Sequence, residues 1–152
     1  MYTLDIPGRS SIRLTHAVFD FNGTLAFEGS LLPGIDEWMK NLHTLLTPIV
    51  LTADTNDSAQ FYTDQLGCQI QVVQSGRQKA EIVRHLNGTV VAVGNGNNDA
   101  DMFQAAALSI AVIGPEGAAL SAVQCADVLV TQIADAFGLL LYPKRLIATL
   151  RS

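Results

Sequence analysis

The stretch "HAVFDFNGTL", residues 16–25, decides how the rest of the chain is interpreted. Its first four residues are mostly apolar, which favours a short buried strand. Asp20 follows this strand, and Asn22 and Gly23 then provide residue types that are common in tight turns. Ligands of open α/β sheets bind beyond the carboxyl ends of the strands. The stretch therefore raises two questions: what Asp20 does there, and why Asn22 is not a second acid.

The same alternation of short apolar runs and helical segments continues along the chain. Strands are predicted at residues 16–20, 48–52, 69–73, 89–94, 108–114 and 127–131. Helices are predicted at residues 34–46, 55–66, 77–87, 98–107, 115–124 and 132–141, with a short one after Pro143. Strands that alternate with helices imply right-handed crossovers and a parallel sheet. The predicted fold is a doubly wound α/β domain with an N-terminal β-hairpin, in which "TLDI" and "SIRL" flank the turn "PGRS".

Composition narrows the classes of partner. The 152 residues are 49% hydrophobic and only 15% charged, against about 25% charged in an average soluble protein. The net charge of -5 argues against nucleic acid and anionic membranes as partners. The sequence lacks an apolar run of about 18 residues and a signal-peptide pattern, so a single cytoplasmic domain over residues 1–152 is expected. Cys68 and Cys125 have no metal-site spacing and are interpreted as reduced thiols.

Four pieces of the sequence, in this order, resemble the haloacid dehalogenase superfamily of phosphatases and phosphotransferases. They are "DFNGT" at 20–24, Thr52 in "VLTAD", Lys79 in "GRQKAE" and "GNGNNDAD" at 94–101. Within the superfamily, the likeness is closest to the phosphorylation domain of P-type cation ATPases and to soluble P-type ATPase-like proteins. The resemblance implies a phosphohydrolase or phosphotransferase that forms an aspartyl-phosphate on Asp20 and needs Mg²⁺.

The resemblance also assigns residues to roles. Catalysis is assigned to Asp20, Lys79 and Thr52. Phosphate binding is assigned to Thr52, Lys79, Phe21, Asn22, Ala53 and Asn98. Magnesium binding is assigned to Asp20, the backbone carbonyl of Asn22, Asn95 and Asp99. These residue types suit the chemistry, because a carboxylate that attacks a phosphate needs cations to offset the repulsion between two anions.

Two positions depart from the family pattern. Asn22 stands where most members carry a second aspartate that acts as general acid and base, and Asn95 stands where the metal loop usually carries an aspartate. An amide cannot donate a proton and take it back, so slow hydrolysis is expected. An alternative is a degenerate phosphate-binding or regulatory module without significant turnover. Asp54 and Glu28 are candidates for a substitute acid.

The spacing of the motifs leaves no room for a cap domain. The intervals Asp20–Thr52 and Thr52–Lys79 are each used by one helix and its loops. Capless relatives act on macromolecules or use a neighbouring subunit as a lid, and the apolar composition favours a homo-oligomer that acts on a small phosphorylated substrate or phosphate. A dinucleotide site at "GNGNND" is disfavoured because the third glycine of that fingerprint is missing.

Overall fold

The structure is a computed structural model of the chain, and it describes residues 1–53 and 58–152. Its centre is a six-stranded sheet in the order β10-β9-β8-β3-β6-β7, in which all neighbouring strands are parallel. The strands are β3 (His16–Phe19), β6 (Thr47–Thr52), β7 (Gln69–Val72), β8 (Val90–Gly94), β9 (Leu108–Val112) and β10 (Val128–Val130). The predicted doubly wound α/β fold is confirmed.

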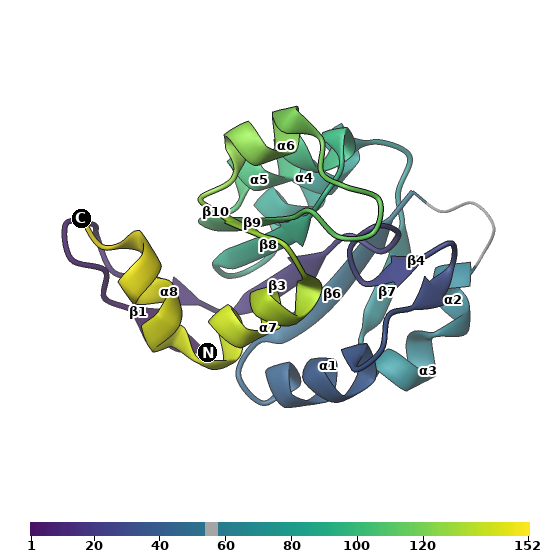
Figure 1. The fold of residues 1–152 in the computed structure, drawn as a ribbon, viewed down its shortest axis with the longest axis horizontal. Helices are drawn as coiled ribbons and strands as arrows, with labels where there is room; N and C mark the ends of the chain where they lie inside the picture. The colour runs from purple at the N-terminus through teal and green to yellow at the C-terminus, as the bar shows by residue number, and fades with distance from the viewer. Residues whose placement is uncertain (54–57) are drawn as a thin grey trace.

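Helices cover both faces of the sheet (Figure 1). One face carries α1 (Ile35–His43) and α7 (Ile133–Leu141), and the other carries α4 (Gly76–His85), α5 (Ala100–Ala105) and α6 (Leu120–Cys125). The side chains of β3 alternate between the two layers, because successive residues of a strand point to opposite faces. Ala17 and Phe19 join the core beneath α1 and α7, whereas Val18 joins the core beneath α4 and α5.

The N-terminal hairpin forms as predicted. β1 (Tyr2–Leu4) pairs antiparallel with β2 (Ile12–Leu14), and the turn between them contains Gly8 at φ 86°. The C-terminal helix α8 (Pro143–Leu150) lies beside this hairpin (Figure 1). Leu4 of the hairpin and Leu146 of α8 are both fully buried in one core cluster, so the two ends of the chain close the same side of the sheet.

A small hairpin, the flap, follows the Asp20 segment. It consists of β4 (Ala26–Phe27) and β5 (Ser30–Leu31), which pair antiparallel across Glu28 and Gly29. Both turn residues have positive φ, 49° and 81°, as a two-residue type I′ turn requires. In the fully described interval between β3 and β6, the flap and α1 are the only elements, so no cap domain is inserted there.

Three predicted helices differ from the observed ones. The helix expected at 55–66 is described as two short ones, α2 (Ser58–Phe61) and α3 (Thr63–Leu66), and residues 54–57 lie outside the described residues. The segment 98–107 begins as a 3₁₀ turn, η1 (Asn97–Asp99), and continues as α5. The helix expected from 115 begins only at Leu120, because Gly114 and Gly117 both take positive φ.

Within residues 1–53 and 58–152, every helix is too short or too polar to cross a membrane.

Candidate active site

The residues that the sequence singles out lie at one rim of the sheet. Asp20 directly follows β3, Thr52 is the last residue of β6, and Asn95 directly follows β8. β3 lies between β6 and β8, and all three strands run in the same direction, so these three residues meet at the carboxyl edge. The pairing of β3 with β8 continues one residue beyond β3, because the Asp20 N–H donates to the Val93 carbonyl oxygen at 2.9 Å.

Lys79 bridges two carboxylates behind this rim. Its Nζ donates to Asp20 Oδ1 at 2.7 Å and to Asp99 Oδ1 at 2.8 Å. The Lys79 side chain is fully buried, and so is that of Asp99. A buried ammonium is costly unless it is paired and hydrogen-bonded, and here both conditions are met. Lys79 comes from α4, which begins with Ser75 as a side-chain cap that accepts from the Gln78 N–H.

Asp99 contacts Lys79 with one oxygen and the backbone with the other. Its Oδ2 accepts from the backbone N–H groups of Asn95, at 3.0 Å, and Gly96, at 2.9 Å. Gly94 allows this close approach, since a Cβ there would lie 2.5 Å from Asp99 Oδ2. Both oxygens of Asp99 are engaged and the residue is fully buried, which favours positioning Lys79 and the 95–96 loop over the metal-ligand role that the resemblance implies.

Two carboxylates share a single ammonium at this place, which leaves an excess of negative charge. Burial and then the charge of Asp99 raise the pKa of Asp20 to about 7, against the opposing effect of Lys79. Burial alone would lower the pKa of Lys79, but the charges of Asp20 and Asp99 outweigh it, and the pKa is raised. The site is therefore short of positive charge, which is the electrostatic condition under which a divalent cation binds.

The raised pKa of Asp20 makes the stability of the metal-free protein depend on pH. A carboxyl group whose pKa is higher in the folded state contributes stability that is fully present below its unfolded pKa, 3.8, and is lost as pH rises through about 7. We expect the difference in free energy of unfolding between Asp20→Asn and the wild type to grow in favour of the variant from about pH 4 to pH 7. Urea unfolding of both proteins across this range measures it, and a constant difference would contradict the coupling.

A cavity of about 300 Å³ opens in front of Asp20. It is lined by Asp20, Asn22, Thr52, Ala53, Asn95, Gly96, Asn98 and Glu116. Six of the predicted site residues thus line one cavity, while Lys79 and Asp99 lie behind Asp20. Phe21 has a fully buried ring that packs against Tyr62, with 6.1 Å between the ring centroids, so it would present its backbone to a ligand.

Both asparagines that depart from the family pattern have structural hydrogen bonds. Asn22 Oδ1 accepts from the Gly29 N–H at 3.0 Å and so ties the turn of the flap to the Asp20 segment. Asn95 Oδ1 accepts from the buried Thr24 hydroxyl at 3.2 Å, and its Nδ2 donates to the Gly117 carbonyl oxygen at 3.1 Å. Of the two proposed substitute acids, Glu28 is exposed at the tip of the flap and Asp54 lies outside the described residues.

Glu116 is a lining residue that the sequence interpretation missed, since it was assigned to a helix. It lies in the loop between β9 and α6, which follows a strand at the same carboxyl edge as Asp20. The signal in the sequence is "IGPEGA" at 113–118, because two glycines around Pro-Glu favour a turn over a helix start.

The start of α4 must approach the 95–99 loop closely for Lys79 to reach the carboxylates. A Cβ at Gly76 would lie 2.4 Å from the Asn98 backbone oxygen. We expect Gly76→Ala to push α4 outward and to lower the free energy of unfolding by about 1–3 kcal/mol. Gly138→Ala is the matched control, because its Cβ would meet only the end of the Arg145 side chain, at 3.2 Å. Thermal unfolding compares the two, and equal melting temperatures would contradict the packing argument.

Comparison with known proteins gives a relative that is similar in sequence and many solved structures with a similar fold. No protein-family model matches the chain. An uncharacterised protein of Methanocaldococcus jannaschii, MJ0073, is 46% identical over 65 residues, which are 43% of this chain and 70% of that protein.

Among solved structures, 3-deoxy-D-manno-octulosonate 8-phosphate phosphatase from Moraxella catarrhalis, in complex with magnesium, phosphate and its sugar, has a TM-score of 0.70. It is 14% identical, over 91% of this chain and 94% of its own. A zinc-transporting P-type ATPase has a TM-score of 0.68 and 26% identity over 79% of this chain. The match covers 20% of that ATPase. Phosphoserine phosphatases are also among the similar structures.

Proposed function

The chain belongs to one family with the Methanocaldococcus protein and has the haloacid dehalogenase fold, and from this premise we propose that it is a Mg²⁺-dependent phosphohydrolase or phosphotransferase. The reaction passes through an aspartyl-phosphate on Asp20. The observation that carries the proposal is the buried Lys79, held between Asp20 and Asp99 directly behind the Asp20 carboxylate that lines the polar cavity.

The attack step uses Asp20 as the nucleophile. A carboxylate oxygen forms a bond to phosphorus while the bond to the leaving oxygen breaks, and the leaving oxygen takes the electron pair and then a proton from solvent water. Water then cleaves the acyl phosphate and releases phosphate. Lys79 holds Asp20 Oδ1 at 2.7 Å and so fixes the orientation of the carboxylate before attack. The Thr52 side chain, at the end of β6, supplies a hydroxyl to a phosphate oxygen in the same cavity.

The donor set of the cavity fits magnesium. Mg²⁺ prefers oxygen ligands, and the residues that would hold it are the Asp20 carboxylate, the Asn22 backbone carbonyl and the Asn95 amide oxygen. The Asn95 oxygen accepts a hydrogen bond from the Thr24 hydroxyl, and an amide oxygen has a second lone pair with which it would bind the ion. Bound there, the ion would neutralise charge on the transferred phosphoryl group. The excess of negative charge around Lys79 supports the same assignment, because this one ammonium is paired with two carboxylates, those of Asp20 and Asp99.

The size of the cavity supports a small substrate. A volume of about 300 Å³ is at the lower end of the range for small-molecule sites. It suits a phosphate group with a small leaving group. The exposed apolar side chains of Phe27 on the flap and Phe61 on α2 support the proposal of a homo-oligomer.

A degenerate regulatory module is the second candidate. The observation that favours it concerns Asn22 and Asn95, which stand at the two positions where the family usually carries an aspartate. Both side chains make hydrogen bonds that hold neighbouring segments together. Turnover separates the two candidates. The enzyme proposal predicts Mg²⁺-dependent release of phosphate from a small aryl phosphate, at a low rate. Absence of release at any pH, with Mg²⁺ present, would leave only the regulatory module.

A further inference from the structure

The loop between β9 and α6, residues 113–119, is fastened at both ends to the proposed catalytic segments. Gly114 packs on the Asp20 turn, since a Cβ there would lie 2.7 Å from the Gly23 carbonyl oxygen. At the other end, the Asn95 side chain donates to the Gly117 carbonyl oxygen at 3.1 Å, and the Ala119 N–H donates to the Asn95 carbonyl oxygen at 2.8 Å. Glu116 lies between these attachments, so its position is fixed by the site.

A turn aims Glu116 at the cavity. The Gly117 N–H donates to the Gly114 carbonyl oxygen at 3.3 Å, which closes a β-turn with Pro115 and Glu116 as its central residues. The carboxylate then reaches Gly23. The position that a Gly23 Cβ would occupy is 2.6 Å from Glu116 Oε2 and 2.4 Å from Asn95 Nδ2. Gly23 therefore makes the room in which the carboxylate and the amide of Asn95 approach each other.

The amide at position 95 and the carboxylate at position 116 complement each other. An aspartate at 95 could not donate to the Gly117 carbonyl oxygen, so the loop attachment needs the asparagine. The same asparagine removes one negative charge from the proposed metal site. Glu116 contributes a negatively charged carboxylate to the same cavity, next to Asn95.

On these grounds we propose that Glu116 is a metal-binding carboxylate of this site and supplies the negative charge that Asn95 lacks. The inference rests on the proposed Mg²⁺-dependent function and adds to it a residue from a different loop. An ordinary exposed loop glutamate would be expected to project into solvent. Glu116, although exposed overall, lines the cavity and approaches Gly23 with its carboxylate oxygen.

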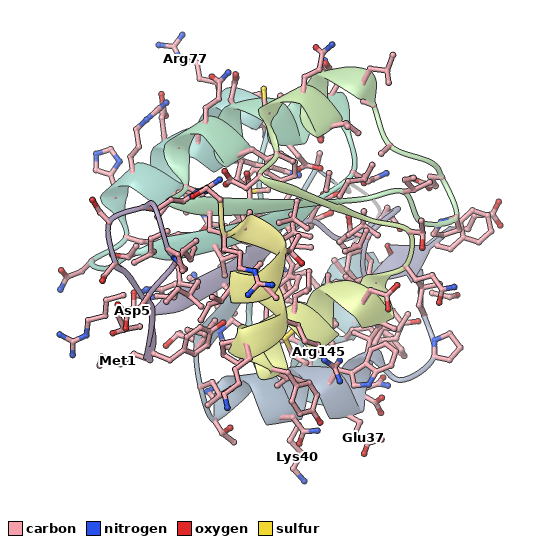
Figure 2. All side chains as sticks on the ribbon, turned by 60° about the vertical axis from the view of Figure 1, so that its left-hand side comes forward. Met1, Asp5, Glu37, Lys40, Arg77 and Arg145 are labelled. Carbon is pink, nitrogen blue, oxygen red and sulfur yellow. The ribbon has the colours of Figure 1, made fainter. Side chains whose placement is uncertain are left out.

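Calorimetric titration of the full chain with Mg²⁺ alone tests the inference. Glu116→Gln should weaken Mg²⁺ binding by at least about 10-fold, because the loss even of a group that only orients a metal ligand typically costs about 10- to 100-fold in affinity. The matched control is Glu37→Gln, which removes the same charge from the same residue type. Glu37 projects outward from α1 and lies outside the residues that line the cavity (Figure 2). The Mg²⁺ affinity of Glu37→Gln should stay within about twofold of that of the wild type.

A double variant tests whether a carboxylate at position 95 can replace the one at position 116. Adding Asn95→Asp to Glu116→Gln should recover at least part of the lost affinity, because a carboxylate is again present beside Gly23. Equal Mg²⁺ affinity of Glu116→Gln and the wild type would overturn the role of Glu116 and leave the proposed function intact. A wild type that binds no Mg²⁺ would overturn both. Melting temperatures without metal show that each variant is folded.

Discussion

Replacement of Asp20 by asparagine is expected to abolish phosphatase activity, with a fall of at least about 10³-fold, to the rate of the assay without protein. The amide has nearly the shape of the carboxylate but is a far weaker nucleophile. The measurement is phosphate release from a small aryl phosphate with Mg²⁺ present. Retention of the wild-type rate by Asp20→Asn would exclude Asp20 as the nucleophile.

The variant should remain folded, which makes the loss of activity interpretable. Lys79 keeps its hydrogen bond to Asp99, 2.8 Å long, and the side-chain oxygen of an asparagine at position 20 can still accept the second hydrogen bond that Lys79 donates. The repulsion between the charges at positions 20 and 99 disappears at the same time. A melting temperature at or above that of the metal-free wild type at neutral pH is therefore the expected control result.

The second large effect has the opposite sign: Asn22→Asp is expected to raise the hydrolysis rate at least tenfold. General acid and base assistance is typically worth about 10² to 10⁴ in rate. The hydrogen bond from the Gly29 N–H, 3.0 Å long to Asn22 Oδ1, can be accepted equally by a carboxylate, so the flap should keep its place. Initial rates with the same aryl phosphate measure the effect.

The control for this gain is Asn87→Asp, which makes the same chemical change at an exposed residue after α4. Its rate should equal that of the wild type. An unchanged rate in Asn22→Asp would mean that another group already supplies the proton or that proton transfer does not limit turnover. Either result would contradict our explanation of why Asn22 slows the enzyme.

Much of the fold was predictable from local pattern. The apolar runs ending in Asp20, Thr52 and Gly94 indicated three strands of one parallel sheet, and the rule that crossovers are right-handed gave the architecture. The helix expected from residue 115 was wrong because Gly114 and Gly117 take positive φ values in a turn. The two glycines around Pro115 and Glu116 favour this turn locally, whereas the packing of Gly114 on Gly23 is a contact between distant parts of the chain.

The candidate site was predictable only in part, for the same reason. Asp20, Thr52 and Asn95 could be grouped because each ends a strand of the sheet. The contact between Asp99 and Lys79 could not be predicted, because it depends on the hydrogen bonds that the backbone N–H groups of Asn95 and Gly96 donate to the other Asp99 oxygen. Glu116 reaches the cavity through two attachments of its loop, and neither one leaves a periodic or motif-like signal in the sequence.

The central claim is that a phosphoryl group is carried by Asp20, and trapping that intermediate tests it most directly. The wild type is mixed with an aryl phosphate and Mg²⁺, quenched in acid during turnover, and digested for mass spectrometry. Slow hydrolysis, attributed to Asn22, should let the intermediate accumulate. We expect one phosphoryl group on the peptide that contains Asp20, converted to homoserine at position 20 by borohydride, and absent in Asp20→Asn. Turnover with the phosphoryl group on another residue, or on none, would contradict the claim.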